Sequence, residues 1–147
     1  MEDIYIGTPN AKQDEFLRCK KKYVAFGGAR GGGKSWAVRC KAKLLAQRYP
    51  GIRMLLVRRT MPEIEANHLE TLRLELAGTA VYRAEERRFV FGNGSVLQFG
   101  YCACDRDADR YQGAEYDVIF FDEATQLKEQ WMRKLAACAV SYTHLRA

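Results

Sequence analysis

Residues 28–35 of the chain match the phosphate-loop pattern G-x-x-x-x-G-K-[ST] at every fixed position. Glycines let the backbone curl so that successive N–H groups point at phosphate oxygens, and a following helix adds its partial positive charge. Lys34 would then reach the β and γ phosphates, and the Ser35 hydroxyl would ligate Mg²⁺. The pattern predicts a nucleotide site formed by Gly28, Ala29, Arg30, Gly31, Gly32, Gly33, Lys34 and Ser35.

A second chemical signature lies where an apolar run, residues 116–121, ends in two carboxylates. Asp122 would hold the Mg²⁺ shell together with Ser35. Glu123 lies one residue further, where its carboxylate could orient and polarise the water that attacks the γ-phosphate. An acidic strand end is weak evidence by itself, but together with the upstream loop it predicts ATP hydrolysis.

The elements that must position these groups can be read from the hydrophobic pattern. The phosphate loop stands between a short apolar run, 23–26, and a helical pattern, 36–49. The run 52–57 is apolar enough for burial on both faces, which is typical of a parallel sheet. A strand, a loop, a helix and a second strand in this order predict a right-handed crossover unit and an α/β fold.

Further elements follow the second strand. A helix is predicted from a capping box of Thr60 and Glu63 to Gly78, with Ile64, Leu69, Leu72 and Leu76 on its apolar side. Asn93-Gly94 between two apolar runs predicts an antiparallel hairpin with a type I′ turn. Residues 105–113 are predicted to form a loop or short helix, and Thr125 to cap a last helix in which Trp131 packs in the core.

Three residues outside the two signatures have roles that the sequence leaves open. Gln13 offers a donor and an acceptor and could pair with the adenine edge, or it could be a solvated helix glutamine. Arg58 and Arg59 are predicted at the carboxyl end of a strand, where they could contact phosphate or DNA or lie in solvent.

Composition limits the class of protein. The chain of 147 residues has the size of one domain, and its formal charge of +6 favours a polyanionic partner without proving one. Its five cysteines are odd in number and lack the spacing of a metal site, which indicates reduced thiols. No signal-peptide pattern and no apolar stretch of about 18 residues is present, so neither secretion nor membrane insertion is predicted.

Several linked motifs resemble the ATPase part of the large terminase subunit of tailed bacteriophages. The resemblance covers roughly residues 8–137, and its motifs are residues 13–17, 27–35, 58–60, 111–117 and 121–126. It implies a P-loop NTPase of the additional-strand, catalytic-glutamate (RecA-like) class, with a mainly parallel sheet and an inserted antiparallel hairpin. It also implies that Arg30 senses or stabilises the γ-phosphate. A second arginine would come from a neighbouring subunit, with Arg106 and Arg110 as candidates.

What the resemblance implies for the whole protein is a motor that uses ATP and Mg²⁺ to drive double-stranded DNA into a procapsid. Its partners would be DNA, a portal protein, a small terminase subunit and further copies in a ring, in the cytoplasm of the infected host. Complete family members are several times longer and carry a nuclease, which is missing here. We therefore expect an ATPase domain over 1–137, truncated on its C-terminal side. The end of the chain breaks the helical pattern, so 138–147 is expected to be a non-native or disordered tail.

Two other functions fit the same residues. One is a helicase or DNA translocase of the same ATPase class. The other is a regulatory module that binds ATP without hydrolysing it. A water-orienting carboxylate at Glu123 favours hydrolysis over the regulatory function.

Overall fold

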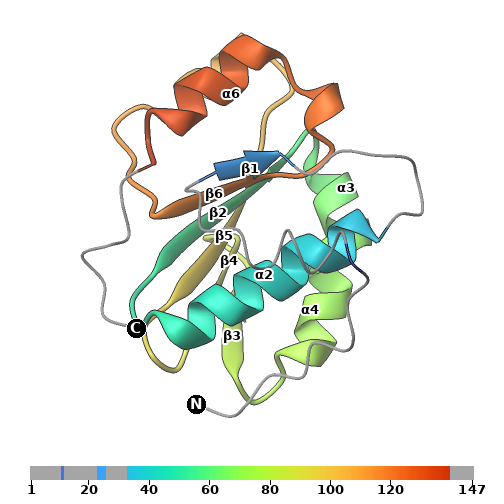
Figure 1. The fold of residues 1–147 in the computed structure, drawn as a ribbon, viewed down its shortest axis with the longest axis vertical. Helices are drawn as coiled ribbons and strands as arrows, with labels where there is room; N and C mark the ends of the chain where they lie inside the picture. Colours follow the sequence, from blue (N-terminus) through green and yellow to red (C-terminus); the bar gives the residue numbers. More distant parts are fainter. Residues whose placement is uncertain (1–10, 12–22, 26–32, 140–147) are drawn as a thin grey trace.

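The structure is a computed structural model that describes Ala11, the backbone of 23–25, and residues 33–139. Its elements run along the chain as strands and helices in alternation, with an antiparallel ribbon inserted between α4 and α5 (Figure 1). They are β1 (Tyr23–Ala25), α2 (Lys34–Arg48), β2 (Arg53–Arg58), α3 (Met61–Ile64), a π-helical turn (Glu65–Leu69), α4 (Glu70–Glu75), β3 (Ala80–Arg83), β4 (Arg88–Phe91), β5 (Val96–Tyr101), α5 (Asp105–Asp109), β6 (Val118–Phe121), a 3₁₀ turn (Ala124–Gln126) and α6 (Glu129–Ala136).

The six described strands form one sheet in the order β1-β6-β2-β5-β4-β3. β1, β6, β2 and β5 are parallel neighbours, whereas β4 and β3 continue the sheet as antiparallel strands. A mainly parallel sheet with an antiparallel hairpin is therefore confirmed. β3 was not predicted from the sequence. The additional-strand class stays a prediction, because β1 pairs directly with β6 and no described strand lies between them.

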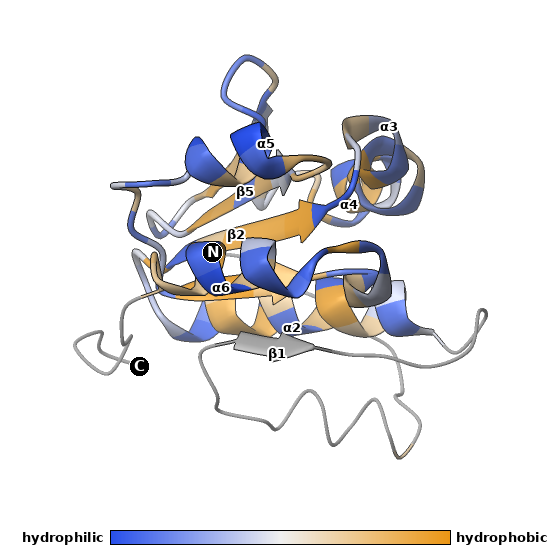
Figure 2. Cartoon of the chain, turned by 90° about the horizontal axis from the view of Figure 1, so that it is seen from above, coloured by the Kyte–Doolittle hydropathy of each residue, from blue (hydrophilic) through white to orange (hydrophobic). Residues whose placement is uncertain are grey.

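Helices cover the sheet on both faces because its central strands are apolar on both sides. Met54 and Leu56 of β2 pack with α2 and with the helix after β2, whereas Leu55 and Val57 pack with α5 and α6. All four side chains are fully buried. Figure 2 shows this distribution, with hydrophobic colour along β2 and hydrophilic colour over α5 and the outer side of α6. Alternate burial of this kind is expected for a parallel strand between two helical layers.

The hairpin between β4 and β5 forms as predicted, but its turn is not type I′. Only Gly94, at φ 86°, has a positive φ in the turn, whereas a type I′ turn requires a positive φ at both central residues. Gly94 N donates to Phe91 O at 3.0 Å, so Gly92 and Asn93 are the central residues of the turn and Gly94 follows them in the left-handed conformation, as in a three-residue hairpin loop. Asn93 Nδ2 donates to Ala46 O of α2 at 2.8 Å, and Asn93 Oδ1 accepts from Ser95 N at 3.1 Å.

Both predicted helix caps also differ from the structure. Thr60 is the residue before α3 but forms no capping hydrogen bond, and Glu63 turns instead toward Arg58, with Oε2 3.6 Å from Nε. Thr125 lies inside the 3₁₀ turn, and α6 begins after Lys128. In each case a tertiary contact or a local turn replaced the cap that the sequence favoured. The predicted apolar side of the helix after β2 is confirmed, since all four of its residues are buried. They are Ile64, Leu69, Leu72 and Leu76.

The described cysteines are free thiols, and the last described residues pack against the fold. Cys40, Cys102, Cys104 and Cys138 are free, and the described residues contain no cluster of three or more side chains suited to a metal ion. Cys138 packs in the core beneath α6, and Ala139 forms an isolated bridge with Tyr116. The origin of the expected tail stays a prediction, because 140–147 lie outside the described residues. Within the described helices, none is long and apolar enough to cross a membrane.

Candidate nucleotide site

The last three residues of the predicted phosphate loop lie at the start of α2. Gly33 precedes the helix in a left-handed conformation, at φ 72° and ψ 22°, which a glycine adopts without steric cost. Its carbonyl accepts the first helical hydrogen bond, from Ala37 N at 3.0 Å. Lys34 and Ser35 follow at the helix N-terminus, where the helix dipole favours an anion. Gly28, Ala29, Arg30, Gly31, Gly32 and Gln13 lie outside the described residues.

The carboxyl end of β6 carries the two predicted acids. Asp122 is 2% exposed, and its backbone N–H donates to Val57 O of β2 at 3.0 Å, which keeps it in the sheet. Glu123 leaves the sheet in a left-handed conformation, at φ 54° and ψ 50°, which is uncommon for a residue with a side chain. The side chain of Glu123 is 26% exposed. The chain thus separates a buried acid from a more accessible neighbour.

Helix α2 and strand β6 bring the two chemical signatures together. Ser35 Oγ donates to Asp122 Oδ2 at 3.4 Å, across 87 positions of sequence. A hydroxyl and a carboxylate at the same point are oxygen donors, the ligand type that Mg²⁺ prefers. The donor set of this site therefore fits the cation that the sequence predicted.

Arg58, at the carboxyl end of β2, lies among three carboxylates. Its Nη1 donates to Asp122 Oδ2 at 3.0 Å, and its Nη2 lies 3.9 Å from Glu123 Oε1. The third partner is Glu63 of α3. Arg58 is only 8% exposed, so these acids compensate a buried cation. Of the two arginines predicted at this strand end, Arg58 enters the site and Arg59 is exposed.

His68 is a second side chain, after Arg58, whose contact with Asp122 was not predicted from the sequence. Its Nε2 lies 2.6 Å from Asp122 Oδ2, and its side chain is fully buried. Burial alone would raise the pKa of Asp122, but the hydrogen bond from His68 and the charge of Arg58 outweigh it and lower that pKa. Asp122 is therefore held as a carboxylate, the form that a metal ligand requires.

The predicted candidates for an arginine donated to a neighbouring subunit lie on and after α5. Arg110 pairs with Asp107 and stacks over the ring of Tyr101, with its guanidinium carbon 4.6 Å from the ring centroid. Arg106 is exposed on α5. Neither contacts Asp122 or Glu123 within this chain, and a role toward a second subunit stays a prediction.

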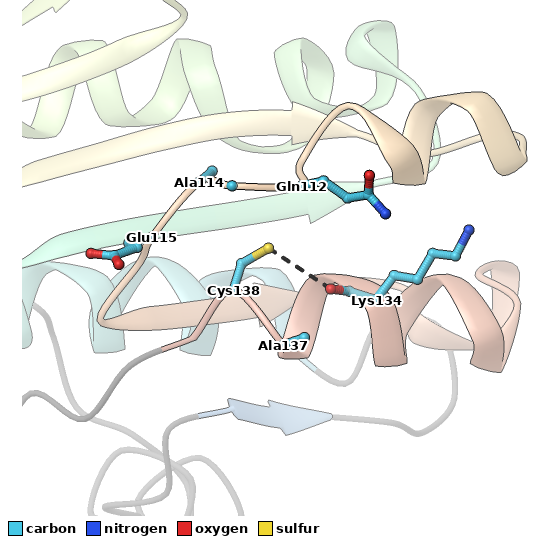
Figure 3. Close-up of a pocket in the computed structure, with 7 residues that line it drawn as sticks. Gln112, Ala114, Glu115, Lys134, Ala137 and Cys138 are labelled. Atoms are coloured by element: carbon cyan, nitrogen blue, oxygen red, sulfur yellow. Dashed lines mark hydrogen bonds between the residues drawn. The ribbon is translucent and has the colours of Figure 1, made fainter.

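Two of the open hollows on the described residues have similar volumes. One, of about 410 Å³, is lined by Arg59, Ala103, Cys104, Asp105, Gln126, Lys128 and Trp131. Another, of similar size, lies between residues 112–115 and the end of α6 (Figure 3). In it the Cys138 thiol faces inward, within 3.8 Å of Lys134 O. Neither hollow is lined by Ser35, Asp122 or Glu123.

Comparison with known proteins gives one family and two solved structures. The family described as terminase large subunit, T4likevirus-type, N-terminal, matches residues 25–141. A search of curated proteins gave no match. The large terminase of a thermophilic bacteriophage, in its second crystal form, is 16% identical with a TM-score of 0.70. The same phage terminase in complex with ADP, in a third crystal form, is 18% identical with a TM-score of 0.67.

These structural matches concern the fold and only part of the related protein. In both cases 88% of this chain is covered, but only 36% of the thermophilic phage terminase. The present chain thus spans about a third of the length of the structures it matches. The family match, over residues 25–141, includes both the start of α2 and the carboxyl end of β6.

Proposed function

Because the chain belongs to the T4-like family of terminase large subunits and matches its N-terminal part, we propose that it is an ATP-hydrolysing module of a DNA-packaging motor. One observation carries the proposal. Ser35 at the start of α2 and Asp122 at the end of β6 meet at 3.4 Å, with Glu123 next to them. The last residue of the proposed phosphate loop therefore lies beside the two acids that we propose for hydrolysis, which supports the proposal.

The two acids have different tasks in this proposal. Asp122 is buried and held ionised, so it suits the metal side together with Ser35. Glu123 is partly exposed and turned out of the strand, so it suits the attacking water. Bound Mg²⁺ would offset the negative charge of the phosphates. Lys34 would hold the β and γ phosphates, and Glu123 would accept a proton from the water.

The remaining assignments concern residues outside the described part of the chain. We assign Gly28, Ala29, Gly31, Gly32 and Gly33 to the backbone cradle of the phosphates and Arg30 to the γ-phosphate. Gln13 would recognise the adenine edge. The ADP complex of the thermophilic phage terminase supports a nucleotide as the ligand of this fold.

The function of the whole protein extends the proposal. ATP turnover would drive double-stranded DNA into a procapsid in the cytoplasm of an infected bacterium. The module would act in a ring, with a portal protein and a small terminase subunit as partners. The additional-strand, catalytic-glutamate class of ATPase is part of the same proposal. The family match favours packaging over a helicase or another translocase.

Two variants test hydrolysis against a regulatory role. Lys34→Ala should weaken binding of a fluorescent ATP analogue, because the phosphates lose their cation. Glu123→Gln should keep that affinity and lower the rate of phosphate release by roughly 100-fold or more, because only the general base is removed. Nucleotide affinity and the rate of phosphate release are both measured on the 147-residue chain in the presence of Mg²⁺.

The outcomes separate the alternatives. Unchanged turnover in the Glu123 variant would contradict the role of that carboxylate. If the unmodified chain binds ATP but releases phosphate no faster than the Glu123→Gln variant, a regulatory module is favoured. DNA-stimulated unwinding activity would favour a helicase.

A further inference from the structure

The helix after β2 widens into a π-helical turn over Glu65–Leu69, between α3 and α4. Two backbone carbonyls near this turn accept hydrogen bonds from side chains. Glu63 O accepts from Asn67 Nδ2 at 2.7 Å, and Asn67 O accepts from Arg39 Nη1 of α2. π-Helical turns often occur at functional positions because they change which side chains face inward. Here the turn buries both His68 and Leu69.

His68 uses this position to reach the acid at the end of β6. Its Nε2 lies 2.6 Å from Asp122 Oδ2, whereas its buried Nδ1 has no hydrogen-bond partner in the described structure. A proton on Nδ1 would be a buried donor without an acceptor, which is costly. We therefore assign the proton to Nε2, which donates to the Asp122 carboxylate.

The contacts of Asp122 fall on one of its two oxygens. Ser35, Arg58 and His68 all reach Oδ2, and no described side chain contacts Oδ1. Arg58 is shared with Glu63 and Glu123, whereas His68 contacts only Asp122 among the described acids. His68 is thus the contact that is dedicated to orienting this carboxylate.

We propose that His68 is a positioning residue that fixes Asp122 Oδ2 and presents Oδ1 to the divalent cation of the bound nucleotide. This inference rests on the proposed nucleotide site. The π-helical turn links both sides of that site. Asn67 O accepts a hydrogen bond from Arg39 of α2, and the adjacent His68 is hydrogen-bonded to Asp122 at the end of β6. A hydrogen bond that orients a metal-ligating group contributes strongly to metal affinity.

A matched pair of amide variants tests the donor at Nε2. The amide nitrogen of His68→Gln can occupy nearly the position of Nε2 and donate to Asp122. His68→Asn carries the same group one methylene closer to the backbone, where it does not reach. Mn²⁺ serves as the probe, because its affinity for the chain with ADP is measurable by electron paramagnetic resonance. A fluorescent ADP analogue in EDTA measures nucleotide affinity without the metal.

The two variants should differ in metal affinity alone. We expect His68→Asn to weaken Mn²⁺ binding by about tenfold or more in the presence of ADP, in the range seen when a contact that orients a metal ligand is lost. His68→Gln should stay close to wild type, and both should bind ADP in EDTA as wild type does. A general packing defect would instead weaken metal-free ADP binding as well. Circular dichroism verifies folding, and if His68→Asn does not fold, the Gln variant decides.

Each failure has a distinct meaning. Wild-type Mn²⁺ affinity in His68→Asn, or an equal loss in His68→Gln, overturns the positioning role and leaves the proposed function standing. A wild-type chain that binds no ADP, with or without Mn²⁺, overturns the proposed function and this inference with it.

Discussion

Ser35 Oγ lies 3.4 Å from Asp122 Oδ2, although 87 positions separate the two residues. Ser35 is in the first turn of α2, and Asp122 follows β6, so the contact joins the start of the helix to the carboxyl edge of the sheet. The same Asp122 oxygen accepts from buried Arg58 at 3.0 Å. Asp122 thus serves the fold as well as the proposed site, and the two roles can be measured separately.

Asp122→Asn should lower the free energy of unfolding by about 1–3 kcal/mol in the absence of nucleotide. The amide keeps the size but leaves Arg58, 8% exposed, with only the more distant Glu63 and Glu123 as acidic partners. Urea unfolding followed by circular dichroism measures the loss. Glu123→Gln is the control and should cost less than about 1 kcal/mol, because its side chain is partly exposed.

Acidification should remove the difference between wild type and Asp122→Asn. The pKa of Asp122 is lowered in the folded chain, so its contribution is present above the unfolded carboxyl pKa and is lost as pH falls through the folded value. An Asn variant as stable as wild type at neutral pH would contradict this account of Asp122.

The ion pair of Lys43 and Glu75, between α2 and α4, should respond unequally to loss of either partner. The Lys43 side chain is 3% exposed and that of Glu75 is 31% exposed. Glu75→Gln should cost about 1–3 kcal/mol, because it leaves a buried ammonium without its counter-ion. Lys43→Met should change stability by less than about 1 kcal/mol, because methionine fills the space and Glu75 stays hydrated. Equal losses in the two variants, in thermal or urea unfolding, would contradict the asymmetry.

The sequence predicted the meeting of the two chemical signatures because parallel strands end at the same edge of a sheet. That rule placed Asp122, Glu123 and the start of α2 together without any knowledge of side-chain contacts. The phosphate loop itself was predicted from spacing alone, and most of it lies outside the described residues. The roles of Lys34, Ser35, Asp122 and Glu123 in chemistry stay predictions.

Arg58 and His68 were harder to predict because their burial depends on distant segments. An arginine at a strand end is usually solvated, and Arg58 is buried only because Glu63, Asp122 and Glu123 converge on it. His68 did leave a signal in the sequence. The apolar step from Ile64 to Leu69 is five residues, wider than the three or four of an α-helix, and a π-helical turn fills that step.

Cys102 and Cys104 should differ in reactivity although one residue separates them. Cys102 is 1% exposed, and burial together with the nearby Asp107 raises its pKa to about 11. At pH 8 only about one Cys102 thiol in a thousand is then the reactive thiolate. Cys104 is exposed. Iodoacetamide should therefore label Cys104 faster, by roughly tenfold or more, in peptide mapping by mass spectrometry. In guanidinium both should label alike, and equal rates in the native chain would contradict the burial of Cys102.

Two glycines of the turn between β4 and β5 should tolerate alanine differently. Gly94 has φ 86°, whereas the φ of Gly92 is not positive. An added Cβ would meet nothing within 4 Å at Gly92 and only Gly51 Cα, at 3.9 Å, at Gly94, so crowding does not separate the two sites. Backbone conformation does, because a side chain in the left-handed region costs about 1–2 kcal/mol.

Gly94→Ala should therefore lower the free energy of unfolding by about 1–2 kcal/mol. Gly92→Ala should leave it unchanged or raise it by up to about 1 kcal/mol, because alanine restricts the unfolded chain. Urea unfolding of the two variants beside wild type measures both effects. Gly94→Asn provides a further comparison, since asparagine tolerates positive φ better than alanine and should recover part of the loss. If Gly94→Ala were as stable as Gly92→Ala, the turn would have to relax to a negative φ, and the hydrogen bond from Gly94 N to Phe91 O at 3.0 Å would be the first contact to change.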